Sequence, residues 1–379
     1  MTAPTFRLST FYFFYFGTLG AMVPYWGLYL DSLGFNAREI GELMACLMAT
    51  RIVSPNIWGY LADRRGDRLG IVRWGTFLAA ACFTGVLFGT SYLWLAAVMS
   101  CFSFFWHAAL PQFEAITLNH LGTQIQRYSH IRLWGSVGFI VAVAGLGPVL
   151  DYTGLAPLPG ILVILIGGIW LASLLAPRDN TPPSHAVTPP LRDVLKRSDV
   201  RALLVVCVLM QASHGPYYTF YSLYLQDHGY TRSVIGQLWA LGVVAEIGIF
   251  LVLHRLSQRF TLRSLLWVSL VLASVRWLMI GWWADSLLIL LLAQLLHAAT
   301  FGVYHAVAIQ LVHGFFHGPH QGRGHALYSS IGFGAGGALG SLYSGYLWTS
   351  VGATMTFMVA AALSAAAWMV AWRWLRHAA

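Results

Sequence analysis

Charged side chains are scarce in this sequence. Asp, Glu, Lys and Arg make up 9% of its 379 residues, hydrophobic residues make up 58%, and the mean hydropathy is +0.66. Since a soluble domain carries roughly 25% charged residues, this chain lacks the side chains that would cover a water-facing surface. The scarcity excludes an ordinary soluble domain. It predicts a protein embedded in a lipid bilayer, which is the first partner that we expect.

Cysteine is also rare, and its four residues all fall inside apolar segments (Cys46, Cys82, Cys101 and Cys207). Their spacing matches neither a disulfide framework nor a metal site. A nucleotide-binding motif is absent too, because the glycine-rich stretch at 332–345 lacks the preceding strand and the Lys-Ser/Thr pair of a phosphate-binding loop. We therefore expect no cofactor, and an ion gradient rather than ATP as the source of energy.

Two features that suggest other partners are better explained without them. His313, His317, His320 and His325 form a histidine-rich run in a glycine-rich loop that has no carboxylate or cysteine, so we expect no bound metal. A net charge of +9 is compatible with binding to nucleic acid, but the basic residues are spread over several short loops instead of forming one patch. We expect no nucleic-acid partner.

Long apolar segments dominate what is present. A membrane-spanning helix needs about 20 predominantly apolar residues, and a polar, proline-rich linker divides the candidate segments into two sets of six. The predicted spans are 8–30, 39–61, 70–90, 93–118, 131–150, 157–176, 200–226, 233–254, 264–284, 286–312, 324–349 and 352–374. The sequence thus predicts an all-α membrane protein with 12 transmembrane helices.

An internal repeat relates the two sets. Residues 229–240 (GYTRSVIGQLWA) align without gaps with residues 34–45 (GFNAREIGELMA) after a shift of 195 residues, about half of the chain. Such a period indicates two similar halves. We predict an N-terminal six-helix bundle at 1–176, a cytoplasmic linker at 177–199 and a C-terminal six-helix bundle at 200–379.

The positions of Lys and Arg predict the orientation. All but four of the 22 Lys and Arg residues fall on the termini, the linker and the loops that follow even-numbered spans. The exceptions are Arg38 and Arg232 on the opposite side, and Arg51 and Arg276 within spans. Since basic loops stay in the cytoplasm, we expect both termini there.

The loop between the second and third spans carries a specific motif. Gly59, Asp63, Arg64, Gly66 and Arg68 follow the pattern Gly-x-x-x-Asp-Arg-x-Gly-x-Arg. A merely topogenic basic loop needs no such spacing. The loop resembles that of the major facilitator superfamily of transporters. This resemblance implies a cytoplasmic gate loop that latches neighbouring helices when the carrier faces outward.

Several ionisable residues fall within predicted spans, where a charge is expensive and is by default a functional hypothesis. The 195-residue shift places Arg51 at the position equivalent to Glu246. Opposite charges at equivalent points of two halves could meet across a central cavity. The alternative is a structural ion pair that locks helices together.

The spacing of Glu114 and Arg132 is similar to that of lactose permease and its relatives. In those carriers the equivalent pair binds the substrate, and an aromatic residue at the position of Phe139 stacks on the substrate. The resemblance implies a substrate-binding role for Glu114, Arg132 and Phe139. Arg51, which the repeat places opposite Glu246, is predicted to bind substrate with them.

Glu246, Arg276 and His297 match the same group in order and spacing, but Thr300 stands where lactose permease has a second carboxylate. The three residues are therefore predicted to couple transport to protons. We expect Glu246 to carry the proton and His297 to tune it, with His297 alone as the competing choice.

Longer stretches, such as IRLWGSVGF and IGQLWALGVVAEIGIF, resemble the phenylpropionate permease group, an aromatic-acid branch of the same superfamily. Tyr217 and Tyr221 share one helix face and are predicted to bind the substrate's ring. The alternative is that these aromatics face lipid or the headgroup belt.

The sequence therefore predicts a monomeric secondary transporter of the bacterial inner membrane, without catalytic residues. It would import a small aromatic carboxylic acid with protons by alternating access. Three alternatives stay open: a proton symporter of a sugar or nucleoside, a membrane-embedded enzyme, and a non-transporting sensor built on a carrier scaffold.

Overall fold

The computed structural model describes residues 5–177, 191–317 and 320–375, and these residues form helices and loops without a strand. The first part of the chain contains α1 (Thr5–Ser32), α2 (Ala37–Arg65), α3 (Arg68–Phe83), η1 (Thr84–Leu87), α4 (Tyr92–Leu121), η2 (Gly122–Arg127), α5 (Tyr128–Thr153) and α6 (Leu158–Leu175). The second part contains α7 (Arg192–Lys196), α8 (Ser198–Ser213), α9 (Gly215–Asp227), α10 (Arg232–Arg259), α11 (Leu262–Trp282), α12 (Leu287–Leu295), η3 (Ala298–Val303), α13 (Tyr304–Phe315), α14 (Gln321–Leu327), η5 (Tyr328–Gly336) and α15 (Gly337–Trp374). The prediction of an all-α fold is confirmed.

Every predicted span coincides with one of these helices or with a run of them. The span predicted at 200–226 is divided into α8 and α9 at His214, where Gly215 and Pro216 follow and proline cannot donate a helical hydrogen bond. The span predicted at 286–312 contains the π-helical segment η3 between α12 and α13. The last two spans meet within α15, which consists of two helices joined at Gly352, where the backbone is not helical (φ 85°, ψ 171°).

Eight stretches of the described residues are long and apolar enough to cross a membrane by length and composition. They contain nine of the twelve predicted spans, because one stretch, Gln321–Trp374, holds two. The three others correspond to α1, α2 and the broken pair α8–α9. Of these, α1, α2 and α9 pack against one another, and most residues of α1 and α9 are buried.

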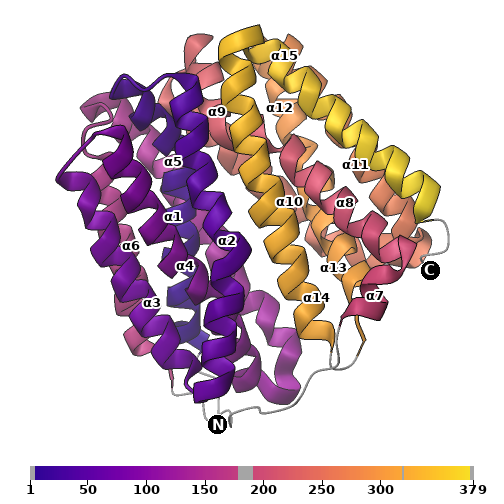
Figure 1. Cartoon of the computed structure of the whole chain (residues 1–379). Coiled ribbons are helices and arrows are strands. Elements are labelled where there is room, and N and C mark those ends of the chain that lie inside the picture. The colour runs from indigo at the N-terminus through magenta and orange to yellow at the C-terminus, as the bar shows by residue number, and fades with distance from the viewer. Residues whose placement is uncertain (1–4, 178–190, 318–319, 376–379) are drawn as a thin grey trace.

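The helices form two groups that stand side by side (Figure 1). We call α1–α6 the N-terminal group and α8–α15 the C-terminal group. Within the first, α1 packs on α5 and α6, and α4 packs on α2 and α3. Within the second, α15 packs on α8, α9 and α11. The groups meet where α2 contacts η5 and α15, α5 contacts α10, and α1 contacts α9. The boundaries predicted for the two bundles stay a prediction, and residues 178–190 of the linker lie outside the described residues.

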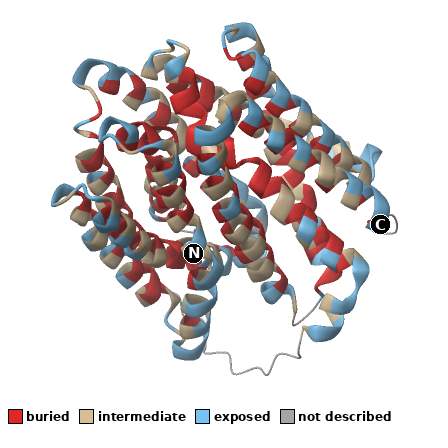
Figure 2. Cartoon of the chain, turned by 45° about the horizontal axis from the view of Figure 1, so that its top comes forward, coloured by how far each residue is buried: buried red, intermediate tan, exposed pale blue. Residues whose placement is uncertain are grey.

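Burial follows this arrangement. Figure 2 shows buried residues concentrated on the inward faces of the helices, with exposed residues around the outside. Large apolar side chains are among the exposed ones, including Phe88 (82% exposed), Leu93 (78%) and Leu251 (80%). An outer surface of this kind suits contact with lipid.

The two groups are joined tightly on the side that carries the loop between α1 and α2. There the Asp151 carboxylate of α5 accepts hydrogen bonds from the backbone N–H groups of Arg232 (2.8 Å) and Ser233 (2.9 Å) at the start of α10, and from the Ser233 hydroxyl. On the other flank Gly41 of α2 meets Gly345 of α15 so closely that a Cβ on Gly41 would lie 2.8 Å from the Gly345 Cα. Glycine permits this approach because it has no side chain.

Candidate functional site

Arg276 of α11 is fully buried, with 0% of its surface exposed. Its guanidinium donates to four neutral acceptors: the Ala293 carbonyl oxygen (2.9 Å), His297 Nδ1 (3.1 Å), Thr300 Oγ1 (3.2 Å) and Gln294 Oε1 (3.2 Å). None of the ion pairs found among the described residues includes Arg276. The guanidinium charge is therefore stabilised by dipoles and not by a counter-ion, which is unusual because a buried charge is costly without one.

Aromatic rings complete the surroundings of this arginine. The guanidinium carbon lies 4.2 Å from the centre of the Tyr217 ring and 4.8 Å from that of Trp277, distances at which the ring faces attract a cation. Tyr217 donates from its hydroxyl to Gln294 Oε1 (3.0 Å), and Gln294 Nε2 donates to the Tyr221 hydroxyl (2.6 Å). We call Tyr217, Tyr221, Arg276, Gln294 and His297 the Arg276 network.

The contact with Arg276 fixes the tautomer of His297. A guanidinium only donates hydrogen bonds, so His297 Nδ1 must be the accepting nitrogen and the ring proton must lie on Nε2. Nε2 faces Glu246 of α10, with 3.8 Å between Nε2 and Oε2. The Glu246 side chain is 19% exposed, whereas that of His297 is 7% exposed. The structure therefore brings the predicted trio together. His297 lies between the partly exposed carboxyl group of Glu246 and the fully buried guanidinium of Arg276.

Beyond His297, a row of stacked rings follows the π-helical segment η3 towards α13. The rings of His297, Phe301 and His305 stack nearly parallel, with centroids 5.2 Å and 5.8 Å apart and interplanar angles of 5° and 4°. His305 Nδ1 then lies 2.8 Å from the Tyr328 hydroxyl, at the start of the second π-helical segment, η5. Such segments are often found at functional sites because they displace the regular helical hydrogen bonds.

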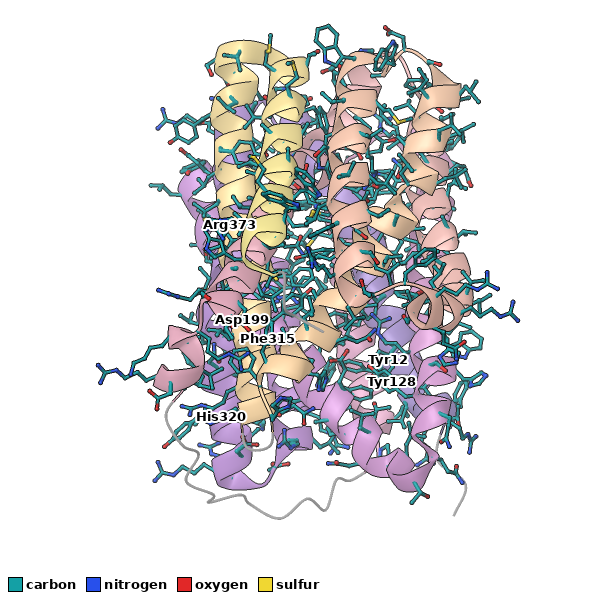
Figure 3. The ribbon with its side chains drawn as sticks, turned by 90° about the vertical axis from the view of Figure 1, so that its right-hand side faces the viewer. Tyr12, Tyr128, Asp199, Phe315, His320 and Arg373 are labelled. Atoms are coloured by element: carbon teal, nitrogen blue, oxygen red, sulfur yellow. The ribbon has the colours of Figure 1, made fainter. Side chains whose placement is uncertain are left out.

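The N-terminal group contributes a second set of charges, which we call the Glu114 cluster: Arg51, Glu114, Tyr128 and Arg132. Glu114 of α4 accepts a hydrogen bond from the Tyr128 hydroxyl (3.3 Å), and both arginines lie within electrostatic range of its carboxylate. The guanidinium carbon of Arg132 on α5 lies 3.7 Å from the centre of the Phe16 ring. Figure 3 shows Tyr128 next to Tyr12 of α1. The cluster holds two cations and one anion beside aromatic faces.

Arg132 and Arg51 also reach the C-terminal group, but in different ways. Arg132 lies within electrostatic range of Glu246. Arg51 Nε donates to the Ser329 hydroxyl (3.2 Å), and its guanidinium lies over the Phe333 ring (4.5 Å). Arg51 and Glu246 do not form an ion pair in this structure, although the repeat places them at equivalent positions. The cation from the opposite group that acts on Glu246 is Arg132.

The predicted aromatic residues lie in two different settings. Tyr217 and Tyr221 are 1% and 0% exposed and belong to the Arg276 network, so neither faces lipid here. Phe139 is partly buried against the core, where α5 passes α1. Gln294 was missed by the sequence analysis. The available signal was an amide in the apolar run LLILLLAQLLH, one helical turn before His297.

The gate loop makes its recorded contacts inside the N-terminal group. Arg68 donates to Asp63 (2.5 Å) and to Gln112 of α4 (2.8 Å), and Arg64 donates to the hydroxyl of Tyr60 (3.3 Å). Gly66 ends α2 with φ 65°, a conformation that favours glycine. Gly59 lies on α2, where an added Cβ would be 3.6 Å from Gln112 Nε2. The role of this loop as a latch between neighbouring helices stays a prediction.

A short contact outside the central region ties α7 and α8 to α13. Arg197 pairs with Asp199 (2.7 Å) and lies over the Phe315 ring (5.3 Å). Figure 3 shows Asp199 and Phe315 close together. On the neighbouring segment, His313 Nε2 and His325 Nε2 lie 2.7 Å apart. Among the described residues no group of three or more potential ligands is placed to hold a metal ion.

Sequence comparisons identify one family, and a comparison with solved structures matches the fold. A sequence model described as the MFS_1 like family matches residues 5–359. The chain is 30% identical over 356 residues to the probable 3-phenylpropionic acid transporter of Escherichia coli K12. The alignment covers 91% of each chain. It is 26% identical to the maltose permease of Geobacillus stearothermophilus, over 89% of this chain and 86% of the permease. The crystal structure of the nucleoside transporter NupG superposes with a TM-score of 0.83 at 16% identity, over 100% of both chains.

Proposed function

This chain belongs to the MFS_1 like family of the major facilitator superfamily, and from that premise we propose that it imports a small aromatic carboxylic acid together with protons. Its relatives and structural neighbours are transporters, so it is an integral membrane transporter of a small solute and not an enzyme. The relative with 30% identity bears the name of a 3-phenylpropionic acid transporter, which is the substrate class that we propose here.

The observation that carries the proposal is the excess of positive charge at the centre. Arg51, Arg132 and Arg276 outnumber Glu114 and Glu246, and Arg276 has only neutral acceptors. An excess of cations away from bulk water is costly. A carboxylate substrate supplies the missing anion. Since Arg276 is sealed, the substrate carboxylate is expected at the half-buried Arg132 or Arg51, beside the rings of the Glu114 cluster.

The arrangement of Glu246, His297 and Arg276 supports Glu246 as the proton carrier. His297 cannot take a second proton on Nδ1 while Arg276 donates to that atom. Its Nε2–H instead faces the carboxyl group of Glu246, which is the more exposed of the two side chains. His297 then tunes Glu246 through this N–H, and the alternative in which His297 itself carries the proton requires that the contact with Arg276 breaks.

Alternating access gives this carboxyl a way to change its proton affinity. Arg132 belongs to the N-terminal group and Glu246 to the C-terminal group, so a rocking of one group against the other changes their separation. A nearby cation favours the ionised carboxylate, and its withdrawal favours the protonated form. The movement that opens one side of the carrier would thereby bind or release a proton.

The proposed topology has both termini in the cytoplasm of a bacterial cell, and the protein in the inner membrane as a monomer. The positions of Lys and Arg support this orientation. The tight contacts of Asp151 and Gly41 would then lie on the outer side. The structure would represent a carrier that is closed to the outside, with two six-helix halves as the moving bodies.

The test is uptake by the purified protein in liposomes. Labelled 3-phenylpropionate should accumulate when the outside is more acidic than the lumen, and accumulation should stop when a protonophore removes the gradient. The methyl ester of the acid is the control for charge, and should compete poorly. If the ester competes as well as the acid, the charge argument is wrong. If the acid accumulates equally well without the gradient, proton coupling is wrong.

A sugar is the second candidate, because the maltose permease relative is 26% identical over most of both chains. The same liposomes should therefore be offered maltose and a nucleoside. Gradient-driven accumulation of either, without uptake of the acid, would replace the proposed substrate. If none of these solutes crosses the membrane, the non-transporting sensor becomes the better explanation.

A further inference from the structure

Gln294 is hydrogen-bonded to three other buried side chains. It lies on α12 with 0% of its surface exposed. Its side-chain amide contacts Arg276 of α11 and the phenol groups of Tyr217 and Tyr221 of α9. A Cβ added to Gly242 of α10 would lie 3.1 Å from Gln294 Oε1, so a fourth helix passes beside it. One amide thus links three helices and contacts a fourth.

The hydrogen bonds fix the orientation of this amide. Arg276 is only a donor, so the atom that faces it at 3.2 Å must be the Gln294 oxygen. The same oxygen accepts from the Tyr217 hydroxyl, and the Gln294 nitrogen donates to the Tyr221 hydroxyl. The amide accepts two bonds and donates one, a combination that a carboxylate cannot provide because it has no donor.

The neutrality of this group has an electrostatic consequence. A glutamate at the same place would set a carboxylate against Arg276 and cancel its charge. With an amide there, one guanidinium nitrogen of Arg276 is held while another donates to His297 Nδ1. The positive potential of Arg276 remains, and it acts through His297 on the region of Glu246.

We propose that Gln294 is a positioning residue, which aims Arg276 at His297 and leaves the arginine's charge unneutralised so that the site selects an anionic substrate. This inference rests on the proposed transport of a carboxylic acid. It assigns the preference for a charged substrate to a residue that does not contact that substrate.

Two substitutions separate charge from structure. Gln294→Glu supplies a counter-charge to Arg276, so the preference for 3-phenylpropionate over its methyl ester should fall about tenfold, the scale of one hydrogen bond to a charged group. The pH midpoint of accumulation should also move to higher pH, because added negative charge favours protonation of Glu246. Gln294→Leu removes the bonds but adds no charge, so the preference for the acid should persist even if transport slows.

Gln211 provides the matched control. It is a second buried glutamine of the C-terminal group, 4% exposed on α8, and it does not bond to Arg276. Gln211→Leu should keep both the preference for the acid and the pH midpoint of the unsubstituted protein. If Gln294→Glu and Gln294→Leu lose the preference equally, or if both retain it fully, the inference is wrong.

A second measurement does not depend on transport. In protein labelled with 15N-histidine, the His297 signal, identified by its loss in His297→Gln, should report the tautomer with the proton on Nε2. Gln294→Leu should mix the two tautomers, since Arg276 loses one of its anchors, and Gln211→Leu should not. If the unsubstituted protein shows no preference for the acid, the proposed substrate is wrong, and the tautomer alone decides the role of Gln294. An unchanged tautomer in Gln294→Leu would overturn that role.

Discussion

The Glu114 cluster and the Arg276 network each accommodate the charge of arginine inside a membrane protein, and they do so in different ways. In the N-terminal group, Glu114 and Arg132 are half-buried beside aromatic faces, and cations and an anion are mixed. In the C-terminal group, Arg276 is sealed and every acceptor is neutral. The first arrangement can exchange partners with a solute, whereas the second holds a charge in fixed geometry.

Under the proposed function, this difference would give different tasks to the N-terminal and C-terminal groups. A site that must bind and release a solute needs exposed groups whose partners can change. A site that must bias a proton needs a constant potential beside one titratable group. We therefore expect substitutions in the Glu114 cluster to change solute binding in every assay, and substitution of Glu246 itself to change only the coupling to protons.

The largest effect is expected for Glu246→Gln. Without an ionisable carboxyl, the carrier should lose gradient-driven accumulation entirely, because no proton is released on the inside. Exchange of labelled for unlabelled acid across the membrane should continue, since it needs no net proton movement. Both rates are measured in the same liposomes. If Glu246→Gln still accumulates the acid and His297→Gln does not, the roles of the two residues are reversed.

A smaller but broader effect is expected for Arg132→Gln. Removing one partner of a charge-assisted contact costs about 2 kcal/mol or more, so the apparent affinity for the acid should fall at least about 30-fold in both accumulation and exchange. Affinity is measured from the concentration dependence of exchange. Arg132→Lys, which keeps the charge without the planar guanidinium, should recover part of it. An exchange affinity that is unchanged in Arg132→Gln would remove the proposed division between the two halves.

The smallest effect is expected in the gate loop, where the repeat itself provides a control. The Asp63–Arg68 pair is partly exposed, with 49% and 24% of the two side chains accessible. Such pairs contribute about 0–1 kcal/mol, so Asp63→Asn should slow uptake by no more than about fivefold. The residue 195 positions later is Gln258, in the last turn of α10, where the motif is absent. Gln258→Asn should transport at the normal rate.

The two variants are compared by their uptake rates at equal amounts of protein inserted in the membrane. Asp63→Asn should leave the affinity in exchange nearly unchanged, because the loop biases the balance of conformations without touching the substrate. A normal uptake rate from Asp63→Asn would mean that the loop only sets the topology.

The sequence was sufficient for the fold class. The twelve apolar segments follow from the thickness of the bilayer and from the need to satisfy backbone groups within each helix. The gate-loop motif identified the superfamily, and the 195-residue repeat predicted two similar halves, before any contact was known. Charges within apolar spans are rare and stand out, and the resemblance to lactose permease then grouped Glu246, Arg276 and His297 as a set.

The tertiary structure decided which of these charges meet. The repeat placed Arg51 opposite Glu246, yet Arg51 lies against Ser329 and Phe333, and Arg132 is the cation within electrostatic range of Glu246. A sequence repeat relates positions in the two halves of one chain. It does not fix the rotation of each helix about its axis or the direction of a long side chain, which depend on packing with the other half.

Gln294 shows the same limit. As one amide in an apolar run it had no partner in the sequence, and its role depends on where α9, α11 and α12 cross. The π-helical turn after it and the break before α9 are also local departures from a regular helix. Apolar composition determined that these segments are helices in a membrane, whereas only the packing of one helix against another determined which polar atoms they bring within hydrogen-bonding distance.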